Sequence, residues 1–447
     1  MKTDQAEAVL STVLDYAKAA GAEGADAMVY SSVSSGVTWR LGKLEEIDRS
    51  EGRDLGLRVL MGNRQACVST NDFSSAMLKD LAERCVDMAR TAPPDPWCGL
   101  APADRLATAP FEDIDMGDFA EPDTQQLKEL AATCEASALN VEGVSNSSGA
   151  SASYGEGQSW FATTSGFLGS SAGSYHSLSV SVLAQDDSGM ETDYDYDSRT
   201  HSTDMRSADA IGARAGARTV ARLSPRKIKS QTAPVLFDKR LSASLLGHLA
   251  GAINGSAIAR GVSFLKDKLG TQIFPKNVMV TDDPHLPRRM GSRAFDGEGV
   301  ANGPLDIIDK GILTTWLLNA AHARQLDLVP NGRASRGTGG PPGASTTNLT
   351  MAPGTHSFDD LVREAGTGLL MTDMFGPQVN SNTGDYSVGC SGFWIDKGEV
   401  THPVSEITIA GNILEMYASL VPANDLEFRG STNAPSLLIP AMTIAGD

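Results

Sequence analysis

The spacing of apolar side chains in residues 1–91 predicts a helix, a set of paired strands and a second helix. Residues 3–20 carry apolar side chains at helical intervals, with Thr3 placed to cap the helix and Gly21 placed to end it. Alternating runs separated by turns predict strands at residues 26–32, 37–40, 44–48, 56–60 and 65–69. A second helix is predicted at 74–91, ending before two prolines. This order is typical of an α+β unit.

Residues 92–225 extend this unit. The stretch 92–122 is rich in Pro, Asp and Ala, which predicts a long irregular segment. Beyond it, the pattern predicts helices at 124–138 and 208–223, and strands at 141–153, 158–165 and 175–185 with Gly/Ser turns between them. Residues 224–227 have the character of a linker. We therefore expect an N-terminal α+β domain with an antiparallel sheet at residues 1–225.

Residues 226–447 predict a C-terminal domain of strongly curved antiparallel β-sheet with few helices. A short buried strand at 235–237 precedes an apolar helix at 242–259. Gly- and Pro-rich loops then alternate with strands, and two similar hairpins with Lys-Gly turns are predicted at 308–313 and 395–400. The fold class of the whole chain is therefore predicted to be α+β.

Composition and charge narrow the class of protein. The 447 residues are 41% hydrophobic and 21% charged, which is typical of an ordered globular chain. A formal net charge of -18 argues against nucleic acid and anionic membranes as main partners. The five cysteines are scattered, and neither a signal peptide nor an apolar membrane span is predicted. We therefore expect a cytoplasmic protein without disulfides.

Residues 169–173 match the Gly-x-Ser-x-Gly pattern of a nucleophile elbow, with Ser171 at its centre. That motif requires a helix after the serine, because a sharp strand-to-helix turn exposes the hydroxyl. Here the run 175–185 alternates like a strand. We therefore interpret the motif as a small-residue turn between two strands.

A glycine-rich stretch at 337–343 lacks the features of a phosphate-binding loop, because Pro341 and Pro342 remove two N–H donors. It is predicted to be a loop of special backbone geometry. The alternative is a loop that lets a peptide backbone approach closely, with Arg333 and Arg336 as peptide-cavity residues that meet a carboxylate.

Four acidic residues occupy alternate positions of a predicted strand, namely Glu191, Asp193, Asp195 and Asp197. Their spacing lacks the glycine turn of a calcium loop. We interpret them as carboxylates on an open surface, with a docking edge for a basic partner as the alternative.

The seven histidines provide no pair at the spacing of a zinc-protease helix. His248 lies on the apolar helix 242–259, and no carboxylate or thiol lies three or four residues away. We therefore predict that His248 is a packed structural residue and that the chain has no zinc site of its own.

Several stretches, spread in order over nearly the whole chain, resemble the TldD/PmbA family, whose members include the modulator-of-DNA-gyrase type of metalloprotease. Within it they are most similar to the TldE/PmbA branch. The stretches are 56–59 (GLRV), 69–72 (STND), 234–237 (PVLF), 244–248 (SLLGH), 263–265 (SFL), 386–389 (YSVG), 392–394 (GFW) and 403–412 (PVSEITIAGN). The last of these is the most specific.

The resemblance implies that two branches share one fold and pair as a heterodimer, and that the TldD branch binds a catalytic zinc through His-Glu-x-x-x-His on a helix. The matching window here is 247–252. Gly247 and Ala252 occupy the two histidine positions, and His248 occupies the glutamate position. Gly and Ala side chains offer a zinc no lone pairs, and the general base is missing as well. We therefore expect no metal or cofactor in this chain, and zinc in a TldD-like partner.

The resemblance also implies that the complex trims or degrades unstructured peptides. We expect the C-terminal half to dimerise and to border an enclosed peptide cavity, with strand addition as a means of capture. A homodimer is expected when the chain is isolated. Two other functions remain open from the sequence: a self-sufficient hydrolase, and a peptide-binding scaffold without proteolytic activity.

Overall fold

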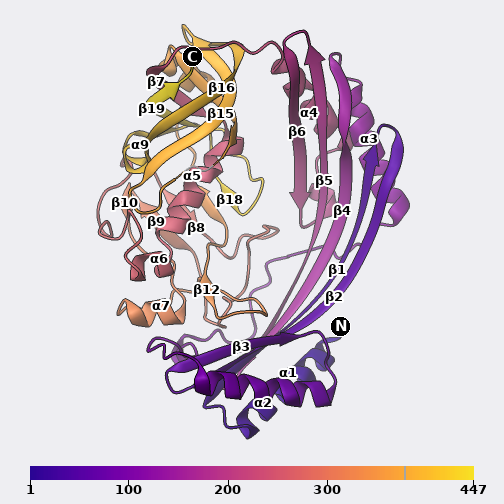
Figure 1. Ribbon diagram of the computed structural model, residues 1–447, viewed down its shortest axis with the longest axis vertical. Coiled ribbons are helices and arrows are strands. Elements are labelled where there is room, and N and C mark those ends of the chain that lie inside the picture. Colours follow the sequence, from indigo (N-terminus) through magenta and orange to yellow (C-terminus); the bar gives the residue numbers. More distant parts are fainter. Residues whose placement is uncertain (377–378) are drawn as a thin grey trace.

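The computed structural model describes residues 1–376 and 379–447. A long curved sheet from the N-terminal half stands beside a C-terminal half of shorter elements, and two helices close the lower end of the molecule in this view (Figure 1). No helix within the described ranges combines the length and the apolar character needed to cross a membrane.

The N-terminal sheet has six strands, all paired antiparallel, in the order β3-β2-β1-β4-β5-β6. The strands are β1 (Gly24–Arg40), β2 (Lys43–Met61), β3 (Arg64–Thr70), β4 (Val144–Thr163), β5 (Leu168–Asp186) and β6 (Gly189–Arg199). The α+β class and the antiparallel sheet predicted for this half are confirmed.

Several predicted strands merge into longer ones. The runs 26–32 and 37–40 belong to the single strand β1, 44–48 and 56–60 belong to β2, and 141–153 and 158–165 belong to β4. The Gly/Ser turn predicted between 153 and 158 was wrong because Gly and Ser can remain in a strand when neighbouring strands pair on both sides. The glycines also have a packing reason: a Cβ at Gly157 would lie 2.7 Å from the Tyr30 hydroxyl.

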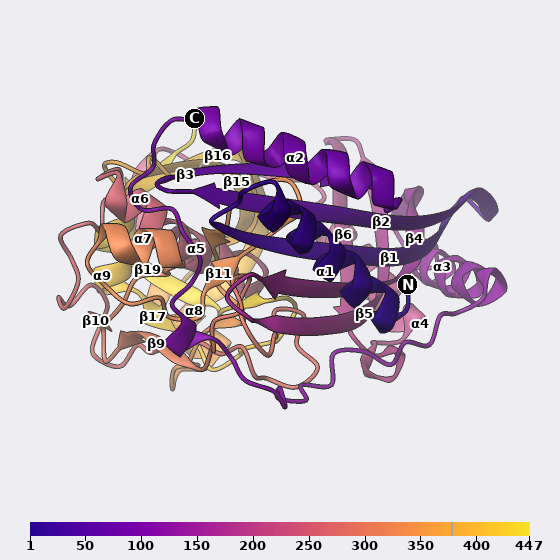
Figure 2. The ribbon, with the colours of Figure 1, turned by 90° about the horizontal axis from the view of Figure 1, so that it is seen from below.

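Two pairs of helices cover the sheet at its two ends. Helices α1 (Thr3–Ala19) and α2 (Ser75–Thr91) lie side by side at one end (Figure 2), where they form a core with β1 and β2. Helices α3 (Thr124–Leu139) and α4 (Ala208–Ala221) form a second core with β4 and β5. All four helices were predicted. The segment between α2 and α3 is irregular apart from the short helix η1 (Ala103–Arg105), also as predicted.

The main sheet of the C-terminal half curls until its edge strand β16 pairs with β19, near the opposite edge. Its strand order is β16-β15-β14-β7-β19-β17. The strands are β7 (Gln231–Phe237), β14 (Gly368–Phe375), β15 (Asp385–Asp396), β16 (Glu399–Asn412), β17 (Val421–Pro422) and β19 (Leu437–Ala445). The curved sheet is confirmed, with one parallel pair, β7 and β14, among antiparallel ones.

The remaining elements belong to the C-terminal half, except η2, which lies between β6 and α4 in the N-terminal half. They are η2 (Ser202–Asp204), α5 (Lys239–Ala252), α6 (Gly255–Ala259), β8 (Val280–Asp282), β9 (Leu305–Asp309), β10 (Ile312–Leu313), α7 (Ala320–Gln325), β11 (Ala334–Ser335), β12 (Gly343–Ala344), β13 (Leu349–Met351), α8 (Phe358–Ala365), α9 (Ile413–Ser419) and β18 (Thr432–Asn433). The single helix predicted at 242–259 is divided into α5 and α6, because the side chain of Asn254 caps a new start by accepting from the Ser256 amide.

The two predicted hairpins are present with the expected turn chemistry. Lys310 and Gly311 have φ values of 49° and 82°, and Lys397 and Gly398 have 51° and 77°. Positive φ at both central residues defines the type I′ turn that matches the twist of paired strands.

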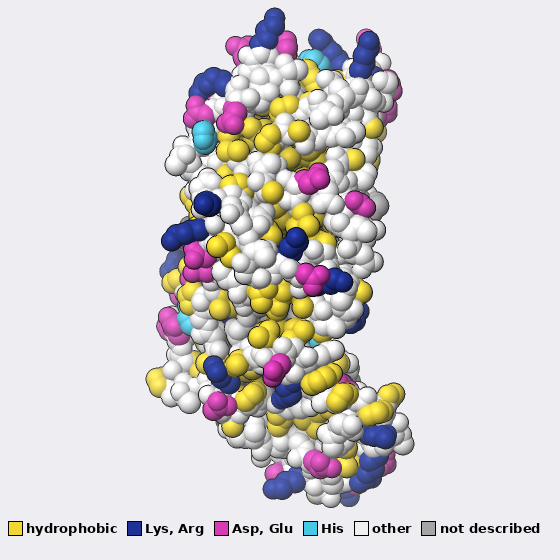
Figure 3. Space-filling model, turned by 90° about the vertical axis from the view of Figure 1, so that its left-hand side faces the viewer, with side chains coloured by type: hydrophobic (Ala, Val, Ile, Leu, Met, Phe, Trp, Pro, Cys, Tyr) yellow, Lys and Arg dark blue, Asp and Glu magenta, His cyan; other side chains and the backbone are white. Residues whose placement is uncertain are grey.

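Viewed from its outer side, the C-terminal half carries apolar side chains along its length with charged groups between them (Figure 3).

Candidate functional site

Helix α5, which carries the window 247–252, is held firmly in the C-terminal core. Asp238 caps its start by accepting from the Arg240 amide at 2.8 Å. Leu245 and Leu249 are fully buried, and the Tyr417 hydroxyl donates to the Leu245 carbonyl at 2.7 Å. The backbone that presents the window is therefore fixed by packing.

The window itself offers no ligand set that fits a zinc ion. Gly247 is exposed, and apart from its chain neighbours and the backbone of its own helix no described atom lies within 4 Å of the position that a Cβ would take. Ala252 is 6% exposed and packs in the core. Outside residues 377–378, no group of three or more His, Cys, Asp or Glu side chains is arranged to hold a metal ion. The absence of a metal from this chain stays a prediction.

His248 lies at the margin of the core. Its side chain is half-buried, and its ring meets the edge of the Tyr386 ring at a centroid distance of 6.3 Å. Tyr386 is 1% exposed, and burial raises the pKa of its phenol. This setting agrees with a packed residue, but the structural role predicted for His248 is untested.

Arg333 does not line a cavity. The side chain is 0% exposed, and its guanidinium is paired with Asp282. It also donates to the carbonyl oxygens of Asp282 at 2.9 Å, Gly303 at 2.7 Å and Gly332 at 3.0 Å. The expectation that it meets a peptide carboxylate is corrected, since every direction of the guanidinium is already used inside the fold.

Arg336 is likewise withdrawn from solvent, with a side chain 1% exposed. Its Nη2 donates a hydrogen bond to Asp26 on β1 at 2.7 Å. Asp26 also accepts a hydrogen bond from Nε of Arg58 on β2 at 2.6 Å. Glu298 completes this buried cluster at 3.9 Å from Arg58. The proposed peptide-cavity role of Arg336 is therefore replaced by a tie between the two halves of the molecule.

The glycine-rich loop 337–343 lies at the same junction. None of its glycines has a positive φ, so its composition does not reflect a left-handed backbone. The backbone of the loop approaches β2 closely at Gly56: a Cβ at Gly56 would lie 2.8 Å from the Thr338 carbonyl carbon. Special backbone geometry was the wrong explanation, because the glycine that the contact requires belongs to β2.

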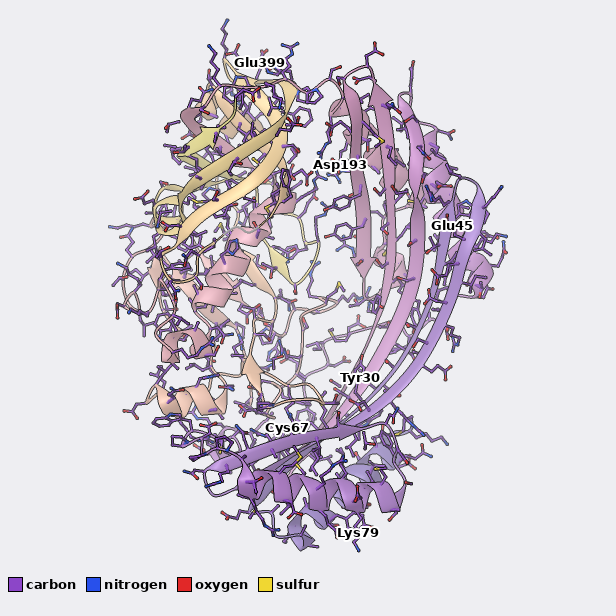
Figure 4. The ribbon with its side chains drawn as sticks, viewed as in Figure 1. Tyr30, Glu45, Cys67, Lys79, Asp193 and Glu399 are labelled. Atoms are coloured by element: carbon purple, nitrogen blue, oxygen red, sulfur yellow. The ribbon has the colours of Figure 1, made fainter. Side chains whose placement is uncertain are left out.

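The acidic positions of β6 are neither open nor unpaired. Asp193, Asp195 and Asp197 are at most 6% exposed, and Asp193 faces the C-terminal half from the sheet edge (Figure 4). Surrounding arginines neutralise these carboxylates: Asp193 pairs with Arg240, Asp195 with Arg206, Arg218 and Arg429, and Asp197 with Arg199. The open-surface interpretation was wrong, and the basic partner is the protein's own chain.

Arg240 and Arg429 belong to the C-terminal half, so this ion network joins the two halves along β6. Arg222 adds a further link, because it contacts Glu191 at 3.2 Å and Asp373 of β14 at 3.0 Å. Burial raises the pKa of Asp195, but its arginine partners outweigh that effect and hold the pKa below the usual range.

The Gly-x-Ser-x-Gly segment lies inside β5 and forms no turn, so the predicted turn was wrong. Strand structure continues on both sides of Ser171, and its hydroxyl lies 2.8 Å from that of Ser159 on β4. A nucleophile elbow requires a helix after the serine. The rejection of that motif is confirmed.

A cavity of about 750 Å³ lies beside this segment. The segment 111–119 forms one wall, residues 290–294 contribute another, and β1, β4 and β5 supply the rest, including Tyr30 (Figure 4). This is the feature that sequence reasoning missed.

Three histidine–carboxylate pairs hold the wall 111–119 in place. His285 lies 3.0 Å from Glu112, His201 lies 3.1 Å from Asp115, and His176 lies 2.9 Å from Asp118. Burial raises the pKa of Asp118, but hydrogen bonds from His176 and Ser202 lower it well below its usual range. No local pattern signals these pairs, because the partners are far apart in the sequence.

Family models match this chain in three parts. The first domain of the PmbA/TldA metallopeptidases matches residues 25–89, the central domain matches 117–223, and the C-terminal domain matches 230–446. The metalloprotease PmbA of Escherichia coli O157:H7 is 38% identical over 443 residues, which cover 98% of this chain and 96% of that protein. The chain belongs to the PmbA/TldD family.

Other members of the family agree with this assignment. The PmbA homologue of Haemophilus influenzae is 34% identical over 98% of this chain and 95% of its own length. A crystal structure from Bacteroides thetaiotaomicron, described as a candidate modulator of DNA gyrase, covers both chains completely with a TM-score of 0.92 and 28% identity. TldE from Thermococcus kodakarensis shares the fold, with a TM-score of 0.87 at 18% identity over 98% of this chain and 100% of that one. This PmbA/TldD family member is thus a metalloprotease-like protein.

Proposed function

We propose that this chain is the non-catalytic subunit of a two-protein cytoplasmic metalloprotease that cleaves or matures unstructured peptides. Its partner is a TldD-like subunit that carries the zinc, and this chain binds no metal or cofactor. The observation that carries the proposal is the α5 window, where Gly247, His248 and Ala252 occupy the positions expected for two ligands and a general base. Zinc proteolysis needs three protein ligands, an open site for water and usually a carboxylate base.

The fold supports pairing even though the window lacks ligands. Similarity to family members extends over almost the whole chain, so the surfaces that pair related subunits are expected to be retained. The C-terminal half also exposes large apolar side chains at 37–49%, which suit a protein interface: Val262, Leu269, Ile312, Leu328 and Val329. We propose that the isolated chain forms a homodimer through the same half.

The decisive experiment mixes this chain with a separately purified TldD-like paralogue and follows cleavage of an unstructured peptide. We expect no cleavage by this chain alone, and a clear gain when the two are mixed. The matched control is the same mixture after the paralogue has been stripped of zinc by a chelator, which is expected to be inactive. Chelator-sensitive cleavage by this chain alone contradicts the proposal, as does full activity of the paralogue without any gain on mixing.

A further inference from the structure

The cavity beside β5 contains a stretch of sheet edge without a strand partner. Strand β6 pairs with β5 only from His176 to Asp186. Residues 168–175 of β5 continue beyond it and pair with β4 alone. An unpaired strand edge presents a row of N–H and C=O groups that another strand can bind.

The direction of these groups follows from one hydrogen bond. The Ser174 amide points away from β4 and donates to the Met116 carbonyl at 3.0 Å. Backbone groups alternate in direction along a strand, so the amides and carbonyls of Ala172 and Ser170 point the same way. Within the described ranges they meet no backbone partner on that side, and both residues are exposed in the cavity.

The surroundings suit an extended chain rather than a compact molecule. Gly169 and Gly173 let neighbouring groups approach the strand closely: a Cβ at Gly169 would lie 2.8 Å from the Phe295 ring, and one at Gly173 would lie 3.3 Å from the Met116 carbonyl oxygen. At one end, Phe111 packs on Phe295 at a centroid distance of 4.9 Å and gives an apolar surface. The wall 111–119 is already fixed by its three histidine–carboxylate pairs, so the cavity needs no ordering before it binds.

The charges of the cavity select for a cationic ligand. Four acids line it, namely Glu112, Asp113, Asp115 and Glu156. Glu112 is paired with His285, and Asp115 with His201 and Arg288. Asp113 and Glu156 have no basic partner among the described residues, so they supply the negative charge that is open to a ligand. Among the described lining residues Arg293 alone is basic, and it is directed elsewhere: its guanidinium donates to the carbonyls of Ala334 at 3.2 Å and Thr346 at 2.9 Å. Asp113 is exposed, and one of its carboxylate oxygens accepts a hydrogen bond from the Asp115 amide two residues further along the loop.

We propose that residues 168–173 of β5 bind an extended, lysine- or arginine-containing peptide by strand addition. The peptide backbone pairs with Ser170 and Ala172, and its basic side chains face the acids of the cavity wall. The inference rests on the proposed role of this chain in holding unstructured peptides, and it locates that role in the N-terminal half, away from α5.

The test measures binding of a fluorescein-labelled, unstructured, lysine-rich peptide to the isolated chain by fluorescence anisotropy. Ala172→Pro removes the outward amide and blocks the edge, but leaves every hydrogen bond to β4 in place. We expect it to weaken binding roughly tenfold or more, as the loss of one or two backbone hydrogen bonds implies. The matched control Ala172→Ser keeps the amide and is expected to bind like the unchanged protein. Far-UV circular dichroism and melting curves establish that both variants are folded.

A second pair of variants tests the charge selection. Asp113→Asn is expected to weaken binding of the lysine-rich peptide several-fold and to reduce its dependence on salt, whereas Asp267→Asn, at an exposed acid in a C-terminal loop, has no effect. A glutamate-rich peptide is expected to bind far more weakly. Equal binding by the folded Ala172→Pro and Ala172→Ser variants overturns the inference, and so does equal affinity for the two peptides.

These outcomes are separable from the fate of the proposed function. Binding is measured without a partner and without cleavage. A gain in cleavage on mixing together with unaltered binding by Ala172→Pro overturns only the inference about β5. Loss of binding in that variant without any gain on mixing supports the peptide site and contradicts the subunit role.

Discussion

Glu298 is a carboxyl group that the fold holds in an unfavourable environment. It is 2% exposed, and burial raises its pKa to about 7 from an ordinary value of 4.5. Arg58 and the Ala320 amide oppose this shift, whereas the nearby carboxylates Asp26 and Asp296 add to it. An acid in an ordinary ion pair has a lowered pKa and stabilises the folded protein more as the pH rises. Glu298, with its raised pKa, has the opposite effect on the free energy of unfolding.

The sign follows from linkage. Because the pKa of Glu298 is higher in the folded than in the unfolded protein, its contribution is most favourable below about 4.5 and is lost as the pH rises towards about 7. Glu298→Gln keeps an acceptor for the Ala320 amide, which lies at 2.7 Å, but does not ionise. We expect the variant to gain a few kcal/mol relative to the unchanged protein over this range.

Urea unfolding at a series of pH values measures this difference. The matched control is Glu364→Gln, at an exposed residue of α8, whose stability is expected to follow that of the unchanged protein at every pH. Parallel curves for Glu298→Gln and the unchanged protein contradict the shifted pKa.

Helix α5 shows how an element persists in the fold without ligands for a metal. Its buried face keeps Leu245, Leu246 and Leu249 in the core, so packing stabilises the helix together with the Asp238 cap. On its other side Gly247 and Gly251 leave open space. His248 lies between these two sides, beside Tyr386.

We predict that His248→Ala lowers stability without changing metal content. The loss of the half-buried ring and of its contact with Tyr386 is expected to cost roughly 1–3 kcal/mol. Thermal melting and elemental analysis of the purified protein measure the two quantities. His356→Ala, at an exposed histidine, serves as the control and is expected to melt normally. A His248→Ala variant that melts normally but abolishes activity of the mixed complex would place His248 at the functional interface instead.

At the scale of the whole molecule, two of the contacts between the halves are built around buried carboxylates. One is the ion network along β6, in which Asp193 meets Arg240 at 3.0 Å and Asp195 meets Arg429 at 2.8 Å. The other is the junction where Arg336 meets Asp26 and the loop 337–343 packs on β2. The cavity beside β5 depends on how the two halves are joined, because residues 290–294 of the C-terminal half form one of its walls and strands of the N-terminal half form another.

We predict that Gly56→Ala disrupts the junction, because its Cβ would lie 2.8 Å from the Thr338 carbonyl carbon. Forcing backbone apart in a packed contact is expected to cost about 2–3 kcal/mol, measured by urea unfolding. Gly52→Ala on the same strand is the matched control, since its Cβ would meet only the Ser32 hydroxyl at an ordinary 3.5 Å. Equal stabilities of the two variants would show that the loop does not press on β2.

The sequence by itself determined the features that depend on neighbours along the chain. Helix faces follow from residues three and four apart, which is why α1 to α4 were predicted close to their observed bounds. The Lys-Gly hairpins follow from the backbone freedom of two adjacent residues. The ligand-free window of α5 is likewise a local property, since Gly247 and Ala252 have no side-chain donor in any fold.

Only the tertiary structure decided which partners distant residues meet. Asp195 became buried and paired because the fold brings three arginines to it: Arg206 from the segment before α4, Arg218 from α4 and Arg429 from the C-terminal half. Arg333 and Arg336 became structural for the same reason, since their carboxylate partners Asp282 and Asp26 arrive from other elements. The lengths of β1, β2 and β4 depend on pairing with strands on both sides, and the wall beside β5 depends on three histidines far from their acids. Such contacts have no local signature, because the free energy that creates them comes from burial and pairing in the assembled fold.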